Sequence, residues 1–218
     1  MTRVLDQDEA VRVLARGGVV ALPTDAVYGV AASLRHPDAV ATLFGLKHRP
    51  DSVPLPVLID DLTQIERLSV TWPEAARRLS VVYWPGPLTI VVRVPDELAR
   101  LVGGVAATAG FRIPDDVALR EILARTGPLA LSSANAHGET PCHSVAEVLA
   151  AFVGRDELEG VVDGGERSGR VSTVVVLSET PWRLVREGAI SSRDLHHVLD
   201  SRDAFTMLSA PRRSINER

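Results

Sequence analysis

The sequence predicts an α/β or α+β fold with a mixed β-sheet. Short apolar segments that end at proline or at polar residues alternate with helical patterns, and neither type dominates. The 218 residues are 45% hydrophobic and 24% charged, which is enough to bury a core without disulfides. No linker interrupts the chain before about residue 200, so we expect one domain over residues 1–200 and a polar tail over residues 201–218.

The expected helices begin at capping residues or at proline. Asp6 precedes the first helix with Glu9 at capping-box spacing, and Gly17 and Gly18 end it. Ser144 begins a later helix in the same way, with Glu147 three residues on. We predict helices over residues 6–16, 37–46, 61–67, 72–80, 116–125, 144–152 and 192–199.

The expected strands are short apolar runs that end at proline, glycine or polar residues. The segment at 84–94 begins as a rigid Trp-Pro-Gly-Pro turn and continues as a strand. We predict the other strands over residues 18–23, 55–59, 106–113, 129–135, 161–165, 172–177 and 182–188. Residues 47–54 are predicted to form a loop that carries basic side chains.

Composition excludes several classes of protein. The net charge of −4 and the pI of about 5.9 argue against a generally basic nucleic-acid binder, although not against a local basic groove. Cys142 is the only cysteine, which excludes an intrachain disulfide and a cysteine-cluster zinc site. The six histidines lack zinc spacing, so we expect no metal site built by the protein. The chain has no signal core and no membrane-length apolar run, and we expect a soluble, cytoplasmic protein.

Polar residues gather where the predicted strands and helices end, which is where α/β folds usually bind ligands. Each of them alone also fits a cap, a turn or a surface charge. Together they predict a cationic pocket for a triphosphate or a carboxylate, lined by hydroxyls and an amide. The cations are Lys47, Arg49, Arg112 and Arg186, with no obvious acidic partner nearby in sequence; the others are Thr24, Thr108, Ser133, Asn135 and Ser172.

Lys47 stands out because 23 of the 24 basic residues are arginine. A coding bias toward arginine accounts for the rarity of lysine. The ammonium group is nevertheless a compact point charge, chemically unlike a guanidinium. We therefore predict that Lys47 is present for its chemistry, as a contact to phosphate.

Seven motifs in order resemble the YrdC-like threonylcarbamoyl-AMP synthase family. They are LPTDAVYGVAA, LFGLKHRPDSVPLPVLI, WPGPLTIVV, FRIP, LSSAN, STVVV and REG, and the overall resemblance extends over about residues 5–199. The pairs Lys47-x-Arg49 and Ser133-x-Asn135 match the paired signature of that family. The resemblance implies an open, twisted, mixed sheet around a concave, positively charged cavity, in the short, single-domain form of the family.

The resemblance also implies an activity. Such enzymes are nucleotidyltransferases that make threonylcarbamoyl-AMP and pyrophosphate from L-threonine, bicarbonate and ATP, with Mg²⁺ carried by the ATP. A downstream transferase complex uses the product to modify the tRNA adenosine next to the anticodon. Direct contact with tRNA or double-stranded RNA remains open at this stage, and no membrane partner is expected.

The resemblance assigns roles by position. For threonine it implies Thr24, Arg112, Ser133 and Ser172. For ATP it implies Lys47, Arg49, Thr108, Asn135 and Arg186, with His143 as a further candidate. The catalytic residues would be Lys47, Arg49, Ser133 and Asn135.

Some positions depart from the family pattern and leave alternatives open. They are Val53, Phe111, the segment 136–138 with His137, and the pair Cys142 and His143. One alternative is a paralogue that acts on a related carbamoyl adenylate. Another is a non-catalytic module that binds double-stranded RNA or tRNA, but the acidic balance and the 4% aromatic content weigh against it.

Overall fold

A computed structural model describes residues 2–50, 53–104, 106–136 and 138–200. The predicted tail over residues 201–218 lies outside these residues, as does His137. The helices are α1 (Gln7–Ala15), α2 (Pro37–Leu46), α3 (Leu62–Arg67), α4 (Glu74–Tyr83), α5 (Asp96–Leu101), α6 (Val117–Thr126), α7 (Val145–Ala151) and α8 (Ser192–Asp200). The strands are β1 (Arg3–Leu5), β2 (Val19–Pro23), β3 (Tyr28–Ser33), β4 (Val57–Leu58), β5 (Leu88–Arg93), β6 (Thr108–Arg112), β7 (Leu129–Ser133), β8 (Leu158–Val162), β9 (Thr173–Val176) and β10 (Arg183–Arg186).

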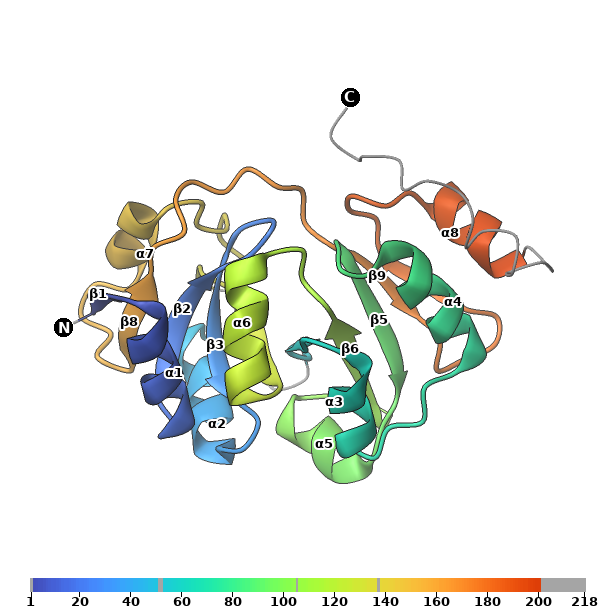
Figure 1. Cartoon of the computed structure of the whole chain (residues 1–218), viewed down its shortest axis with the longest axis horizontal. Helices are drawn as coiled ribbons and strands as arrows, with labels where there is room; N and C mark the ends of the chain where they lie inside the picture. The colour runs from blue at the N-terminus through green and yellow to red at the C-terminus, as the bar shows by residue number, and fades with distance from the viewer. Residues whose placement is uncertain (1, 51–52, 105, 137, 201–218) are drawn as a thin grey trace.

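All of the described strands join one open, mixed sheet. Their order is β1-β8-β2-β3-β7-β4-β6-β5-β9-β10, with parallel and antiparallel neighbours. Helices flank the sheet, as Figure 1 shows. The predicted α/β class with an open, mixed sheet is therefore confirmed.

The short strand β4 joins two groups of strands. On one side of it lie β7, β3, β2, β8 and β1, and on the other lie β6, β5, β9 and β10. In Figure 1, α1, α2, α6 and α7 accompany the first group, and α3, α4, α5 and α8 accompany the second. Residues 163–172, here called the crossover segment, run from β8 to β9 and so also connect the two groups.

Alternation along the strands buries both faces of the sheet. Val30 and Phe111 belong to a large apolar cluster on one face, and Ala31 and Leu131 belong to a second cluster that includes α1 and α6. The predicted capping box of α1 is present: the Glu9 amide donates to the Asp6 carboxylate at 2.7 Å, and the Asp6 amide donates to Glu9 at 3.1 Å.

The predicted elements are all found, with shifted ends, but three observed elements were not predicted. These are β1, β3 and α5. The eighth strand also begins earlier than predicted, at Leu158. None of the described helices has both the length and the apolar composition that crossing a membrane requires.

Candidate functional site

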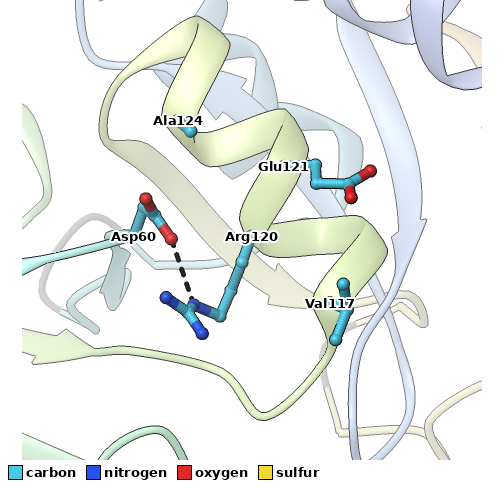
Figure 2. A pocket seen from close by; sticks show the side chains of 5 residues that line it. All are labelled: Asp60, Val117, Arg120, Glu121 and Ala124. Carbon is cyan, nitrogen blue, oxygen red and sulfur yellow. Dashed lines mark hydrogen bonds and ion pairs between the residues drawn. The ribbon is translucent and has the colours of Figure 1, made fainter.

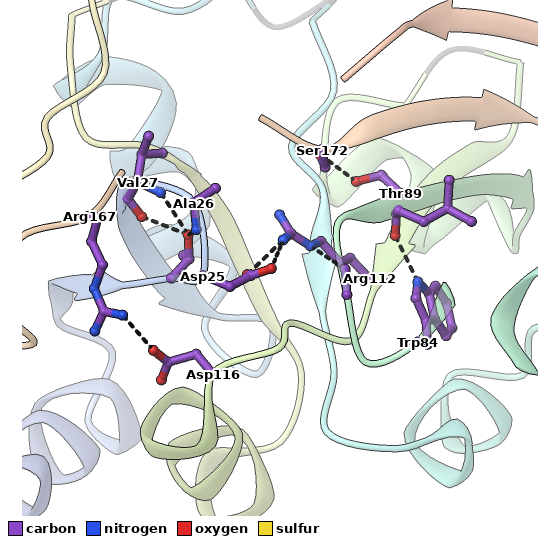
Figure 3. A network of polar contacts seen from close by, with 12 residues as sticks. Asp25, Ala26, Val27, Trp84, Thr89, Arg112, Asp116, Arg167 and Ser172 are labelled. Carbon is purple, nitrogen blue, oxygen red and sulfur yellow. Dashed lines mark hydrogen bonds and ion pairs between the residues drawn. The ribbon is translucent and has the colours of Figure 1, made fainter. Parts of the chain in front are cut away.

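A tight turn after β2 presents the first polar group of the site. The Thr24 hydroxyl donates to the Val27 carbonyl at 2.7 Å and accepts from the Ala26 and Val27 amides at 3.1 and 3.2 Å. Thr24 is buried, so its hydroxyl serves the backbone of the turn in the free protein. The turn leaves the neighbouring Asp25 directed toward β6 (Figure 3).

Arg112, at the end of β6, is the most deeply buried arginine of the predicted site. Its residue is 8% exposed. The Nε atom donates to the Gly86 carbonyl at 2.9 Å, and Nη2 donates to both carboxylate oxygens of Asp25 at 2.6 Å. Burial lowers the pKa of Arg112, and Asp25 opposes that effect. The guanidinium is therefore a fixed cation, held from two sides and partly neutralised (Figure 3).

Arg186 at the end of β10 and Ser172 just before β9 lie beside Arg112. Arg186 donates through Nε to the Ser172 carbonyl at 2.9 Å and through Nη2 to the Ser172 hydroxyl at 3.0 Å. That hydroxyl lies 3.1 Å from the Thr89 hydroxyl. The loss of hydration and then the positive charge of Arg112 lower the pKa of Arg186. Two guanidinium groups thus lie close enough to repel each other, an arrangement that an anion would relieve.

Lys47 caps the C-terminus of α2 and is 1% exposed. Its ammonium donates to the carbonyls of Ser133 and Asn135, the latter at 2.6 Å, and to the Asn135 side-chain oxygen at 3.2 Å. Burial, followed by the nearby charge of Arg49, lowers the pKa of Lys47 to about 8. The lysine was predicted at the start of a loop, and it does follow the last residue of α2. It is nevertheless buried, because its ammonium binds the end of β7.

Arg49 and Asn135 also bond to backbone groups. Arg49 donates to the Val53 carbonyl at 2.8 Å and to the Pro54 carbonyl at 2.7 Å. The Asn135 amide nitrogen donates to the carbonyls of Ala136 at 2.7 Å and Glu139 at 2.8 Å. In the free protein Asn135 therefore closes the turn after β7 and accepts a bond from Lys47.

The remaining candidates lie at other positions of the fold. Thr108 begins β6 opposite Arg93, at the other end of that strand from Arg112. His143 lies 2.5 Å, through Nδ1, from the Arg167 carbonyl, so it holds the crossover segment. Ser133 ends β7 and contributes its carbonyl to Lys47.

The departures from the family pattern are structural in this chain. Val53 offers its carbonyl to Arg49, and Phe111 is buried in a T-shaped ring contact with Trp72. Cys142 is buried, and burial raises the pKa of its thiol to about 11, so it is a poor nucleophile at neutral pH.

The acidic partners of the arginines were not predicted from the sequence. Asp25 pairs with Arg112 from 87 residues away, and Asp116 pairs with Arg167 at 3.0 Å (Figure 3). The cationic pocket was predicted because no acidic partner lies nearby in sequence, whereas the partner of Arg112 is distant in sequence. A polar residue directly after a buried strand was the one available signal for Asp25.

Two shallow hollows lie elsewhere on the molecule. One of about 210 Å³ lies against α6, where Asp60 and Arg120 pair at 3.0 Å (Figure 2). The other, of about 340 Å³, extends from this pair to Trp84 and α4. Neither is lined by a residue assigned to the predicted site. In the part of the chain that the structure describes, no group of three or more His, Cys, Asp or Glu side chains is arranged to hold a metal ion.

The fold is that of an open, mixed α/β protein, and the arginines and hydroxyls of its polar network suit an anionic ligand. The Sua5/YciO/YrdC family model, described as "Telomere recombination", matches residues 12–188. Threonylcarbamoyl-AMP synthase of Pyrococcus abyssi is 36% identical over 185 residues, which are 84% of this chain and 54% of that protein. Threonylcarbamoyl-AMP synthase of Pseudomonas paraeruginosa is 33% identical over 177 residues, which are 81% of this chain and 94% of that protein.

A solved structure agrees with the sequence relatives. The crystal structure of P. abyssi Sua5 complexed with L-threonine matches with a TM-score of 0.82 and 31% identity, over 91% of this chain and 60% of that one. The chain belongs to the Sua5/YciO/YrdC family. It spans about half the length of the P. abyssi relative.

Proposed function

We propose that this protein is a threonylcarbamoyl-AMP synthase, a nucleotidyltransferase that uses L-threonine, bicarbonate and ATP. The observation that carries the proposal is the buried Arg112, with Arg186 and Ser172 beside it. A fixed guanidinium at the end of a strand suits the carboxylate of an amino acid. The relatives named as threonylcarbamoyl-AMP synthases and the threonine complex of Sua5 support threonine as that amino acid.

The proposed reaction has three steps. Bicarbonate takes up a proton and releases water to give carbon dioxide. The amino group of threonine then adds to the carbon dioxide and loses a proton, which forms a carbamate. A carbamate oxygen then attacks the α-phosphorus of ATP, the bond to the β-phosphate oxygen breaks, and pyrophosphate leaves. Holding the carbamate beside the α-phosphate makes this attack effectively unimolecular.

Lys47 and Arg49 are proposed to bind the nucleotide phosphates. Arg49 lies close enough to Lys47 for its charge to contribute to the lowered pKa of Lys47. Such cations stabilise the charge that develops on the α-phosphate and on the leaving pyrophosphate. Mg²⁺ bound to the ATP phosphates would add further charge neutralisation. Thr108, Asn135 and His143 remain proposed nucleotide contacts.

The product is proposed to pass to a transferase complex that modifies tRNA next to the anticodon, in the cytoplasm. The experiment measures pyrophosphate release by the purified chain with ATP, Mg²⁺, bicarbonate and L-threonine. We expect release that requires all three substrates, together with a threonine-containing adenylate detected by mass spectrometry.

Two controls sharpen this assay. Arg112→Met should abolish the release, whereas Asp60→Asn, in the pair beside α6, should retain it. Pyrophosphate release without threonine would point to a different carbamoyl adenylate. The complete absence of release, with tRNA bound tightly, would favour the non-catalytic alternative.

A further inference from the structure

Arg112 is anchored in a way that leaves only part of its guanidinium for a ligand. Gly86 holds Nε and Asp25 holds Nη2. Among the residues that the structure describes, Nη1 has no hydrogen-bond partner. A guanidinium carries five N–H donors in a rigid plane, so fixing two nitrogens also fixes the direction of the third.

We infer that Asp25 is a positioning residue for amino-acid binding. It holds Arg112 so that Nη1 is directed toward the carboxylate of the bound amino acid. This inference rests on the proposed function and assigns a role to a residue outside the predicted site. The Asp25 and Arg112 side chains are 14% and 9% exposed, so solvent screens their attraction only weakly. The carboxylate also offsets part of the charge that burial disfavours on Arg112.

The crossover segment sets the position of Asp25 in turn. The Gly169 amide donates to the Ala26 carbonyl at 3.1 Å. A Cβ atom at Gly169 would lie 2.2 Å from the Asp25 carbonyl oxygen and 2.7 Å from the Ala26 Cα atom. These are backbone atoms, so a side chain at residue 169 displaces the turn that carries Asp25. The close approach of Gly169 therefore belongs to the same positioning device.

Asp25→Asn tests the role of the carboxylate with little change in shape. Both carboxylate oxygens accept from Nη2, and the amide replaces one of them with a donor that opposes Nη2. The anchor at Gly86 remains, so Arg112 keeps one of its two restraints. We expect the KM for L-threonine to rise about tenfold or more, because small misplacements of a binding group have large effects. The KM for ATP should change little.

Gly169→Ala provides an independent route to the same result, since it moves Asp25 without altering any charge. It should raise the KM for threonine in the same direction and leave the KM for ATP nearly unchanged. Asp60→Asn is the matched control, because it breaks the Asp60–Arg120 pair and should change neither KM. If Asp25→Asn does not fold, the result for Gly169→Ala decides the question.

A readout that does not depend on catalysis separates this inference from the proposed function. With ¹⁵N-labelled arginine, the Nη–H signals of Arg112 are assigned by their loss in Arg112→Lys, and their exchange with solvent is followed, because Asp25 holds Nη2. We expect slow exchange in the unaltered protein and faster exchange in Asp25→Asn. Unchanged exchange, or a lower KM for threonine in Asp25→Asn, overturns the positioning role. Failure of the unaltered protein to bind threonine instead overturns the proposed substrate.

Discussion

Lys47 should titrate far below an ordinary lysine, and this chain allows the effect to be measured cleanly. It is the only lysine among the 218 residues, so a protein labelled with [ε-¹³C]lysine gives a single lysine signal. Burial and the charge of Arg49 lower the pKa of Lys47 from 10.5 to about 8. We expect the midpoint of the signal near 8 in the folded protein and near the ordinary value in urea.

The size of the effect on stability follows from the same numbers. Between pH 8 and 10.5 the unfolded chain binds the proton that the folded chain has released, so the free energy of unfolding rises with pH in this range. The full change is on the order of 3 kcal/mol. Below pH 8 Lys47 is protonated in both the folded and the unfolded chain. The free energy of unfolding there stays lower than it is above pH 10.5, by the full change given above.

Urea unfolding at a series of pH values, compared with Lys47→Met, isolates this contribution. Titration of groups distant from Lys47 occurs in both proteins and cancels in the difference. Cys142 is coupled to Lys47, but its pKa of about 11 places its titration above the range compared. ATP supplies a further test, because phosphates near the ammonium would stabilise its charge and raise the midpoint. A midpoint near 10.5 in the free protein would refute the burial argument. A midpoint that ATP leaves unchanged would refute the phosphate contact.

Three further predictions concern the arginines and Asn135. Arg112→Lys should raise the KM for threonine more than the KM for ATP, because an ammonium does not reproduce a guanidinium held at two nitrogens. Steady-state kinetics with each substrate varied in turn checks this. Arg186→Met should weaken anion binding, because it removes one of two guanidinium groups that lie near each other; titration calorimetry with pyrophosphate measures this. Asn135→Ala should lower the melting temperature, because three hydrogen bonds of the turn disappear. The expected decrease is about 2–4 °C for each kcal/mol of stability lost. Calorimetry measures it, and an unchanged melting temperature would contradict the structural role.

Much of the fold was predictable because its signals are local. The α1 helix has its cap and its terminating glycines in the sequence, and α2 has a proline in its first turn. The strand β3 lacked such a signal. All six of its residues are buried, and a run with glycine and alanine has neither alternation nor a β-branched majority. Only its pairing with β2 and β7 makes it a strand.

The site was predictable in its residue types but not in its contacts. Cations and hydroxyls at the ends of elements indicated an anion site, and the structure brings Arg112, Arg186 and Ser172 together. The pairing of Asp25 with Arg112 joins residues 87 positions apart, and no local pattern specifies such a contact. For the same reason the burial of Lys47 could not be predicted from the residues around it.

The contacts of Lys47 constrain how ATP could bind. An ammonium has three N–H donors, and in the free protein Lys47 has three acceptors: the carbonyls of Ser133 and Asn135 and the Asn135 side-chain oxygen. A phosphate oxygen can therefore bind Lys47 directly only by replacing one of them. The Asn135 side-chain contact is the longest, at 3.2 Å, and a side chain moves more readily than a strand end. Direct phosphate binding to Lys47 thus requires Asn135 to turn, which links the two residues that sequence analysis assigned separately to the nucleotide.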